Sequence, residues 1–261
     1  MIYVTGDCHQ DFKKFNTKNF PEQKKMTGED YVIICGDFGA VWDYEGETKH
    51  EKQLLDWLDE KPFTVLFVDG NHENFDRLYS YPVEMWHGGK VHKIRPSVIH
   101  LMRGQIFEIE GKRIFTFGGA SCHDISGGIL DPEAPDYMER KRALNEEWIP
   151  YRVNHRSWWA QEIASEEEME EGAANLETLD CKVDYIITHC CSTEIQKLID
   201  PYGFYGVNDQ TEYLEEIRNH VEYDKWYFGH YHDNRNISDK EVLLFEDILE
   251  IGEVCKEKKE D

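Results

Sequence analysis

Long apolar runs are missing from this sequence. The longest unbroken ones are about the length of Tyr31–Cys35, whereas a membrane-spanning helix needs roughly 18 to 20 apolar residues. The N-terminus reads MIYVTGD and has neither a basic region nor a long apolar region. We therefore expect neither a membrane segment nor a cleaved signal peptide.

Positive charge is scarce as well. The chain of 261 residues has 29 Lys and Arg against 53 Asp and Glu, a formal net charge of −24. Nucleic acids and anionic membranes both require a positive surface, so this balance argues against either as a general partner. A locally positive pocket remains compatible with the net charge, because salt screens charges over about 8–10 Å.

Cysteine is present in an odd number, seven, and the sequence has no C-x-x-C motif. This pattern excludes zinc-finger spacing and argues against a disulfide framework, which favours a reducing, cytoplasmic setting. The adjacent Cys190 and Cys191 are interpreted as buried thiols near a site rather than as a redox pair.

What the sequence does contain is an alternation of short β-branched or aromatic runs with helical patterns, which predicts an α/β fold of layered sheets. Hydrophobic residues make up 40% of the chain, enough for a substantial core. We expect helices over Thr48–Asp59, Ser157–Leu179 and Thr211–Val221, and a hairpin turn at Glu110-Gly111. The expected strands are Ile2–Val4, Tyr31–Cys35, Thr64–Val68, Val98–Met102, Gln105–Ile109, Arg113–Phe117, Tyr185–Thr188, Lys225–Phe228 and Val242–Phe245.

The organisation along the chain predicts one domain over residues 1–252, with residues 121–180 as a partly helical insertion or cap and residues 253–261 as a charged tail. Within the insertion, residues 139–156 hold five basic and three acidic side chains, in contrast to the rest of the chain. This basic stretch is either a solvated helix face or a contact surface for an anionic substrate.

Side chains of metal-ligand type follow five of the expected strands. Because ligand sites in α/β sheets gather at the carboxyl ends of the strands, we expect these side chains to meet. Residues i and i+2 of an extended chain point the same way, so each pair in D-x-H and H-x-H can face one point. In chain order the motifs hold Asp7 and His9, then Asp37, then Asn71 and His72, then His189, then His230 and His232.

Two carboxylates, one carboxamide and several imidazoles suit divalent ions of intermediate softness. Seven such ligands exceed the need of one ion, so two ions sharing a carboxylate fit better. Two divalent ions against two aspartates leave a net positive pocket, which attracts phosphate.

This ordered set of motifs, from Asp7 to His232, resembles that of the calcineurin-like metallophosphoesterase superfamily, in particular its small bacterial and phage members. The resemblance implies a sandwich of two mixed β-sheets flanked by helices, with a dinuclear metal site at the carboxyl ends of the strands. It also implies two divalent cations (Mn, Fe, Ni or Zn) and hydrolysis by attack of a metal-bridging hydroxide on phosphorus.

Carried over by motif, the resemblance assigns a role to each residue. Asp7, His9 and His232 would hold the first cation. Asn71, His189 and His230 would hold the second, and Asp37 would bridge the two. His72 would be the catalytic residue near the leaving-group oxygen, as a general acid or as a hydrogen-bond donor to phosphate.

The second motif departs from the protein Ser/Thr phosphatase branch, which has G-D-x-x-D-R-G. This chain has Gly36-Asp37-Phe38-Gly39-Ala40 and no D-R-G, which argues against a protein phosphatase. His72 thereby lacks the acidic partner of that branch, and Glu73 and Asp69 are the candidates to orient it. The Gly118–Ser121 segment with Asp124 resembles a feature of the small members, and Asp124 is a candidate substrate contact.

Substrate specificity is expected in the insertion. Arg152, His155 or Arg156 could contact phosphate, because arginine donates in bidentate fashion. Trp158 or Trp159 could stack on a base, or could instead pack the insertion onto the core.

The leading interpretation is a phosphoesterase that acts on a small phosphodiester or nucleotide-like substrate. The alternatives are a phosphomonoesterase or phosphoprotein phosphatase, a nuclease that uses the basic stretch, and a non-catalytic metal-binding scaffold.

Overall fold

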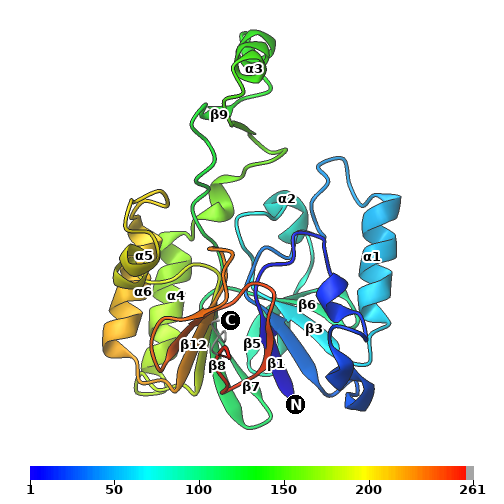
Figure 1. Cartoon of the computed structure of the whole chain (residues 1–261), viewed down its shortest axis with the longest axis vertical. Helices are drawn as coiled ribbons and strands as arrows, with labels where there is room; N and C mark the ends of the chain where they lie inside the picture. The colour runs from blue at the N-terminus through cyan, green and yellow to red at the C-terminus, as the bar shows by residue number, and fades with distance from the viewer. Residues whose placement is uncertain (257–261) are drawn as a thin grey trace, which may run out of the picture.

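Two mixed β-sheets pack face to face in the computed structural model, which describes residues 1–256 (Figure 1). Helices cover the outer face of each sheet, and the carboxyl ends of the central strands point to one edge of the sandwich. This arrangement confirms the predicted α/β sandwich of two mixed sheets. In residues 1–256, no helix combines the length and hydrophobicity required to cross a bilayer.

The first sheet has seven strands, of which the central four are parallel. The edge strands β15, β5 and β4 run antiparallel to their neighbours. In spatial order the strands are β15 (Ile248–Glu250), β1 (Ile2–Thr5), β2 (Tyr31–Ile34), β3 (Thr64–Phe67), β6 (Val98–Leu101), β5 (Gly89–Arg95) and β4 (Val83–Trp86).

The second sheet has six strands, again with four parallel strands at its centre. The outer strands β13 and β7 are antiparallel to their neighbours. In spatial order the strands are β13 (Arg235–Asn236), β14 (Glu241–Leu243), β12 (Lys225–Phe228), β11 (Tyr185–Thr188), β8 (Lys112–Phe117) and β7 (Gln105–Ile109).

Both faces of the central strands are buried, which explains their unbroken apolar runs. Along β2, Ile33 faces the other sheet while Val32 and Ile34 face the helical layer. Strand β11 does the same in the second sheet, where Ile187 faces inward and Ile186 outward.

The helices form the two outer layers. Helix α1 (Lys49–Asp59) packs Leu55 and Leu58 on the first sheet. Leu176 and Leu214 place α4 and α6 on the second sheet. The remaining bounds are α2 (Phe75–Leu78), α3 (Tyr137–Glu146), α4 (Glu166–Glu177), α5 (Thr193–Ile199) and α6 (Asp209–His220), with 3-10 helices at Lys13–Phe15, Pro21–Lys25 and Ala160–Glu162.

Most sequence-predicted elements agree with the structure to within one or two residues. The hairpin turn between β7 and β8 is present, with positive φ at Glu110 (51°) and Gly111 (73°), as a two-residue hairpin turn requires. The hairpin of β4 and β5 was not predicted. Both of its strands contain charged residues, and Val83 and Met85 of β4 are exposed, so the hairpin lacks the unbroken buried run that identified the other strands.

The predicted helix Ser157–Leu179 is wrong in its first half. Only a short 3-10 helix occurs there, and α4 begins at Glu166. Ser165 caps α4 and forms a capping box with Glu168, in which each side chain bonds to the other residue's backbone N–H. This S-x-x-E pattern is typical of a helix start, so the helix begins after Ser165 and does not include the residues that precede it.

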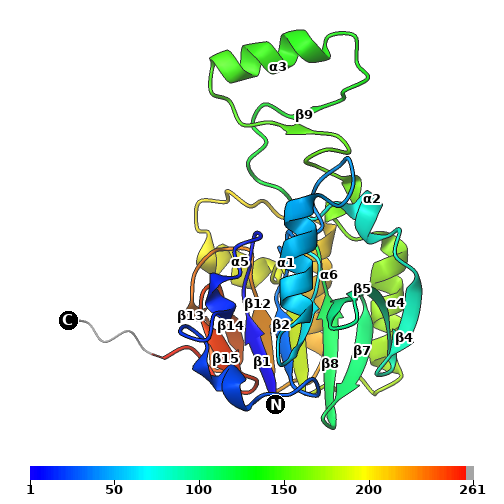
Figure 2. The same cartoon turned by 90° about the vertical axis from the view of Figure 1, so that its right-hand side faces the viewer.

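A projecting arm, defined here as residues 124–158, rises from the edge of the sandwich where the carboxyl ends of the central strands lie (Figure 2). It consists of β9 (Ile129–Leu130), β10 (Arg152–Val153) and α3, around a small cluster of Leu130, Tyr137 and Val153. The stretch expected as an insertion, residues 121–180, thus contains both this arm and α4, which packs on the second sheet. Of the expected tail, residues 257–261 lie outside the described part of the chain.

Arg103 joins the two layers just below the arm and is buried with 3% exposure. Its guanidinium donates to Asp69 at 2.9 and 2.5 Å, to the Gln161 carbonyl at 2.6 Å and to Glu168 at 3.0 Å. Asp69 also bonds to His100 at 2.9 Å. One buried cation therefore holds the end of β3, the base of the arm and α4 together.

Replacing this cation should be strongly destabilising, because it leaves the Asp69 carboxylate buried without its partner. We expect Arg103→Met to lower the free energy of unfolding by about 3–5 kcal/mol, measured by urea denaturation. Arg142→Met, which breaks an exposed pair with Glu146, is the matched control and should change it by less than about 0.5 kcal/mol. Equal effects of the two substitutions would contradict the structural role of Arg103.

Candidate metal centre

The candidate site lies where the carboxyl ends of five parallel strands meet. Strands β1, β2 and β3 are neighbours in the first sheet, and β11 and β12 are neighbours in the second. The loops that follow them hold all the sequence-predicted ligands. The structure brings these side chains together from positions 7 to 232 of the chain.

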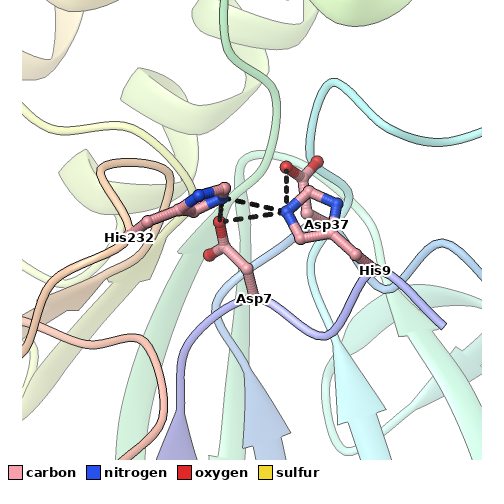
Figure 3. A group of neighbouring side chains, drawn as sticks. All are labelled: Asp7, His9, Asp37 and His232. Atoms are coloured by element: carbon pink, nitrogen blue, oxygen red, sulfur yellow. Dashed lines mark hydrogen bonds and ion pairs between the residues drawn. The ribbon is translucent and has the colours of Figure 1, made fainter. Parts of the chain in front are cut away.

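Four side chains form the first group: Asp7, His9, Asp37 and His232 (Figure 3). One potential ligand atom from each lies within 4.8 Å of the others. His232 Nε2 lies 3.2 Å from an Asp7 oxygen, and His9 Nε2 lies 3.4 Å from an Asp37 oxygen. The two Nε2 atoms are 3.0 Å apart, so both rings point at the same place.

The second group shares Asp37 and adds His189 and His230, again with ligand atoms within 4.8 Å. His189 Nε2 is 3.4 Å from Asp37 Oδ1 and 3.4 Å from Asn71 Oδ1. The other ring nitrogen of His189 donates to the Cys35 carbonyl at 2.8 Å. Because a carbonyl oxygen can only accept, that bond places a proton on Nδ1 and makes Nε2 the nitrogen available to a cation.

The backbone at the site is held in an uncommon conformation. Four of the residues have positive φ, namely His9 (47°), Asp37 (45°), His230 (69°) and His232 (48°). Each non-glycine residue in this region costs on the order of 1–3 kcal/mol and persists only where its surroundings enforce it. The two packed sheets supply that enforcement.

Three glycines allow the ligands to approach the strand ends. An added Cβ would lie 2.2 Å from His189 Nδ1 at Gly36, 2.1 Å from Asp37 Oδ1 at Gly70 and 2.1 Å from Asp7 Oδ1 at Gly229. Gly36 also has a φ of 92°. Any other residue at these three positions would displace a candidate ligand.

The electrostatics of the site favour charged aspartates beside histidines. Burial alone would raise the pKa of Asp7, but hydrogen bonds from His232 and His9 hold that pKa below its usual range. Burial acts on Asp37 in the same way, and the charge and hydrogen bond of His189 lower its pKa well below normal. In turn, burial would lower the pKa of His189, but the Asp37 and Asp7 carboxylates raise it to about 9.

These donors fit a pair of divalent cations. Asp7 and Asp37 are each only 1% exposed. A buried carboxylate is stable only beside positive charge or hydrogen-bond donors. Their paired side chains are histidines, whose nitrogen atoms are common ligands of transition metals. The arrangement is therefore a candidate dinuclear metal centre, with Asp37 common to both groups.

His72 lies beside the first group, with its ring centroid 4.9 Å from that of His9. Its backbone N–H donates to Asp37 Oδ1 at 2.7 Å. Burial lowers the pKa of His72, although Asp37 opposes the shift. The neutral ring is therefore favoured at neutral pH.

The expected orienting partners of His72 are engaged elsewhere. Glu73 accepts hydrogen bonds from the backbone of Phe38 and Gly39, and Asp69 binds Arg103. The interpretation that one of these carboxylates orients His72 is therefore wrong.

Asp124 and Arg152, two of the predicted substrate contacts, form an ion pair of 2.5 Å at the base of the arm. Both act electrostatically on His72, which places the pair near the site. Arg156, the third, lies over the ring of Tyr44 at 5.1 Å.

Trp159 is fully buried and donates from Nε1 to Asp76 at 2.7 Å. This contact supports the packing alternative for Trp159 over base stacking. Asp76 also pairs with His155 at 2.7 Å, so both residues attach the arm to α2.

Three aromatic residues at the site were missed from the sequence. The rings of Trp42 and His72 have centroids 5.8 Å apart. The ring of Tyr205 lies 5.0 Å from that of His230, and the ring of His123 lies 5.9 Å from it. All three come from loops and follow no strand end directly, so the pattern that identified the ligands could not find them.

Glu162 was missed as well. It is 2% exposed, and within residues 1–256 its Oε2 atom has no hydrogen-bond partner. Burial raises the pKa of Glu162 to about 9, even though Arg152 lies close enough to lower it. The raised pKa of this buried carboxyl group favours its protonated form at neutral pH.

Comparison with known proteins identifies the family. The model of the calcineurin-like phosphoesterase family matches residues 1–234. The chain therefore belongs to this family, which confirms the resemblance and the predicted class, a phosphoester hydrolase.

Among individual proteins, the chain is similar to lariat debranching enzymes. Identity is 28% over 152 residues to lariat debranching enzyme A of Xenopus laevis, a match that covers 53% of this chain and 27% of the relative. It is 26% over 150 residues to the Danio rerio enzyme, covering 52% of this chain and 25% of the relative. The match thus spans about a quarter of the length of these curated relatives.

A solved structure, the phosphopantetheinyl hydrolase of Mycobacterium tuberculosis, aligns with 94% of this chain and 87% of its own. The TM-score is 0.44 and the sequence identity 16%.

The raised pKa of Glu162 predicts a pH-dependent contribution to stability. Between about pH 4.5 and pH 9 the folded state keeps a proton that the unfolded state loses. Stability from this group is therefore fully present below pH 4.5 and is lost as the pH rises toward 9, by at most about 1.4 kcal/mol per pH unit. Glu162→Gln removes this loss. In urea denaturation, the free energy of unfolding of the variant should therefore rise relative to that of the parent protein from pH 5 to pH 8.

Glu60→Gln, an exposed position at the end of α1, is the control and should follow the parent protein throughout. A constant difference between Glu162→Gln and the parent over this range would contradict a protonated Glu162.

Proposed function

We propose that this chain is a metal-dependent phosphoesterase that hydrolyses a phosphodiester or a nucleotide-like phosphoester. The observation that carries the proposal is the pair of buried carboxylates, Asp7 and Asp37, each surrounded by histidines that point into one place. When bound there, two divalent cations would offset the phosphoryl charge and lower the pKa of a coordinated water.

In this proposal each ligand keeps the role assigned from its motif. Asp7, His9 and His232 hold one cation, and Asn71, His189 and His230 hold the other. Asp37 is shared, which the presence of its carboxylate in both groups supports. Mn, Fe, Ni and Zn are the expected metals, because imidazole and carboxylate ligands suit them.

His72 acts in this proposal as a hydrogen-bond donor. Because burial lowers its pKa, the ring is neutral and can donate one N–H to a phosphoryl or leaving-group oxygen. Positive charge at the ligand cluster would lower that pKa further. Of the two roles considered for His72, donor to phosphate therefore has the better support.

Arg152 contacts the substrate in this proposal, and Asp124 positions it. The guanidinium donates to Asp124 from Nε and Nη2, and the Arg152 side chain is 19% exposed. A phosphate oxygen could take the place of one carboxylate oxygen as acceptor.

The predictions that nucleic acid is not the substrate and that the setting is cytoplasmic rest on charge and cysteine content, and they stay predictions.

The function is tested by adding metals back to metal-stripped protein. We expect hydrolysis of 4-nitrophenyl monoesters or diesters only after addition of Mn, Fe, Ni, Zn or Mg. Asp37→Asn should reduce the bound metal, measured by plasma mass spectrometry, and should lower hydrolysis by about a hundredfold or more, because both cations lose a shared ligand.

Asp11→Asn is the matched control, since Asp11 is exposed and pairs only locally with Lys13. It should retain both metal and activity. Parental turnover by folded Asp37→Asn would exclude the shared role of Asp37, and metal binding without hydrolysis of any phosphoester would favour the scaffold alternative.

Loss of the Arg152 guanidinium should weaken catalysis without loss of metal. We expect Arg152→Ala to lower kcat/KM by about ten- to a hundredfold, the range for losing a hydrogen bond to a charged group. Arg142→Ala, on the exposed face of α3, should leave kcat/KM unchanged.

Arg156→Ala in the same assay tests the third predicted contact. An unaltered kcat/KM would remove the proposed role of each residue concerned.

A further inference from the structure

An aromatic side chain lies beside the ligand cluster on the side of the first sheet. Trp42 belongs to the loop between β2 and α1, is partly exposed, and faces His72 at 5.8 Å between ring centroids. Its backbone N–H donates to Glu51 at 2.7 Å, and its carbonyl accepts from Asn74 at 3.2 Å. Behind it, the ring of Trp159 packs edge-on at 5.8 Å.

A second aromatic side chain lies on the side of the second sheet. Tyr205 belongs to the loop between α5 and α6 and is also partly exposed. Its ring lies 5.0 Å from that of His230, 4.5 Å from that of His123 and 4.7 Å from that of Tyr231. Its backbone N–H donates to Asp200 at 2.9 Å, which holds the loop in place.

The two rings flank the cluster from opposite sides. Trp42 contacts His72, which packs on His9 of the first ligand group. Tyr205 contacts His230, which packs on His189 of the second group. Figure 1 shows the same separation in the fold, with the loop before α1 on one side of the arm and the loop between α5 and α6 on the other.

A phosphomonoester has one organic group and could use only one such ring. A phosphodiester has two, one on each side of phosphorus, and could use both. Both side chains are partly exposed beside the cluster. Aromatic rings favour planar partners, because ring stacking adds to the burial of apolar surface.

We propose that the substrate is a phosphodiester with a planar aromatic group on each side of phosphorus, of the dinucleotide class, and that Trp42 and Tyr205 are the two stacking surfaces. This inference rests on the proposed function and specifies its substrate class. Trp42 receives the leaving group, because it lies beside His72, and Tyr205 receives the group that stays on phosphorus.

Two diesters with the same leaving group isolate the contribution of Tyr205. Bis(4-nitrophenyl) phosphate and ethyl 4-nitrophenyl phosphate both release 4-nitrophenolate and differ only in the group that stays. We expect the ratio of their kcat/KM values, aryl over ethyl, to fall about tenfold in Tyr205→Ala relative to the parent protein with Mn²⁺. The intrinsic reactivity of the two esters cancels in this comparison.

Further variants separate stacking from other effects. Tyr205→Phe keeps the ring and should show the aryl-over-ethyl ratio of the parent protein. Tyr205→Leu keeps apolar volume without the ring, and its ratio should fall as in Tyr205→Ala. Tyr202→Ala, in the same loop and 87% exposed, should match the parent protein. Trp42→Ala should lower kcat/KM for both esters by the same factor, because both share the aryl leaving group, and Trp148→Ala, 91% exposed on the arm, should lower neither.

The outcomes distinguish this inference from the proposed function. An unchanged ratio in folded Tyr205→Ala and Tyr205→Leu would overturn the stacking role while hydrolysis itself stands. Hydrolysis of 4-nitrophenyl phosphate but of neither diester would overturn the diester assignment in favour of a monoesterase. Hydrolysis of none of the three esters by metal-loaded parent protein would overturn the proposed function together with this inference.

Discussion

The burial of two carboxylates where two sheets meet is the constraint on which the rest of the structure depends. Asp7 and Asp37 are each about 1% exposed, and removing an ion from water costs several kcal/mol even after relaxation. Only closely placed positive or polar groups can offset this cost. The histidines that follow β11 and β12 approach from the second sheet, so the same interaction that compensates the aspartates also joins the carboxyl ends of both sheets.

The backbone around the carboxylates is costly in isolation, and this cost falls on residues of the candidate metal centre. Four ligand-type residues have positive φ, and three glycines stand where a Cβ would overlap a candidate ligand. Strain of this kind persists only when rigid surroundings enforce it. The buried apolar strands provide the rigidity, while the loops after them carry the chemistry, so stability and function are divided between neighbouring segments of the same chain.

The sequence predicted the parts of the molecule that follow from local pattern. Apolar runs such as Tyr31–Cys35 indicated strands because both of their faces are buried, and the ligand residues were found because each follows such a run. Trp42 and Tyr205 were not found, since they lie in loops several residues from any strand end and reach the cluster through ring contacts with His72 and His230. The predicted start of α4 is wrong for a different reason: the capping box at Ser165 begins the helix, and the residues before it form only a short 3-10 helix.

The groups proposed to contact the substrate come from three separate segments mounted on one rigid cluster. Trp42 lies in the loop before α1, Arg152 in the arm and Tyr205 in the loop before α6. Arg103 binds the Gln161 carbonyl as well as Asp69, and Trp159 binds Asp76, so the segment directly after the arm is fixed to the loop and helix that follow β3. Since the strand-end loops hold the ligands without help from Trp42 or Tyr205, changes in these contact segments can alter substrate preference while the metal centre keeps its geometry. If the proposed roles hold, specificity and hydrolysis are separable in this fold, because different residues would be responsible for each.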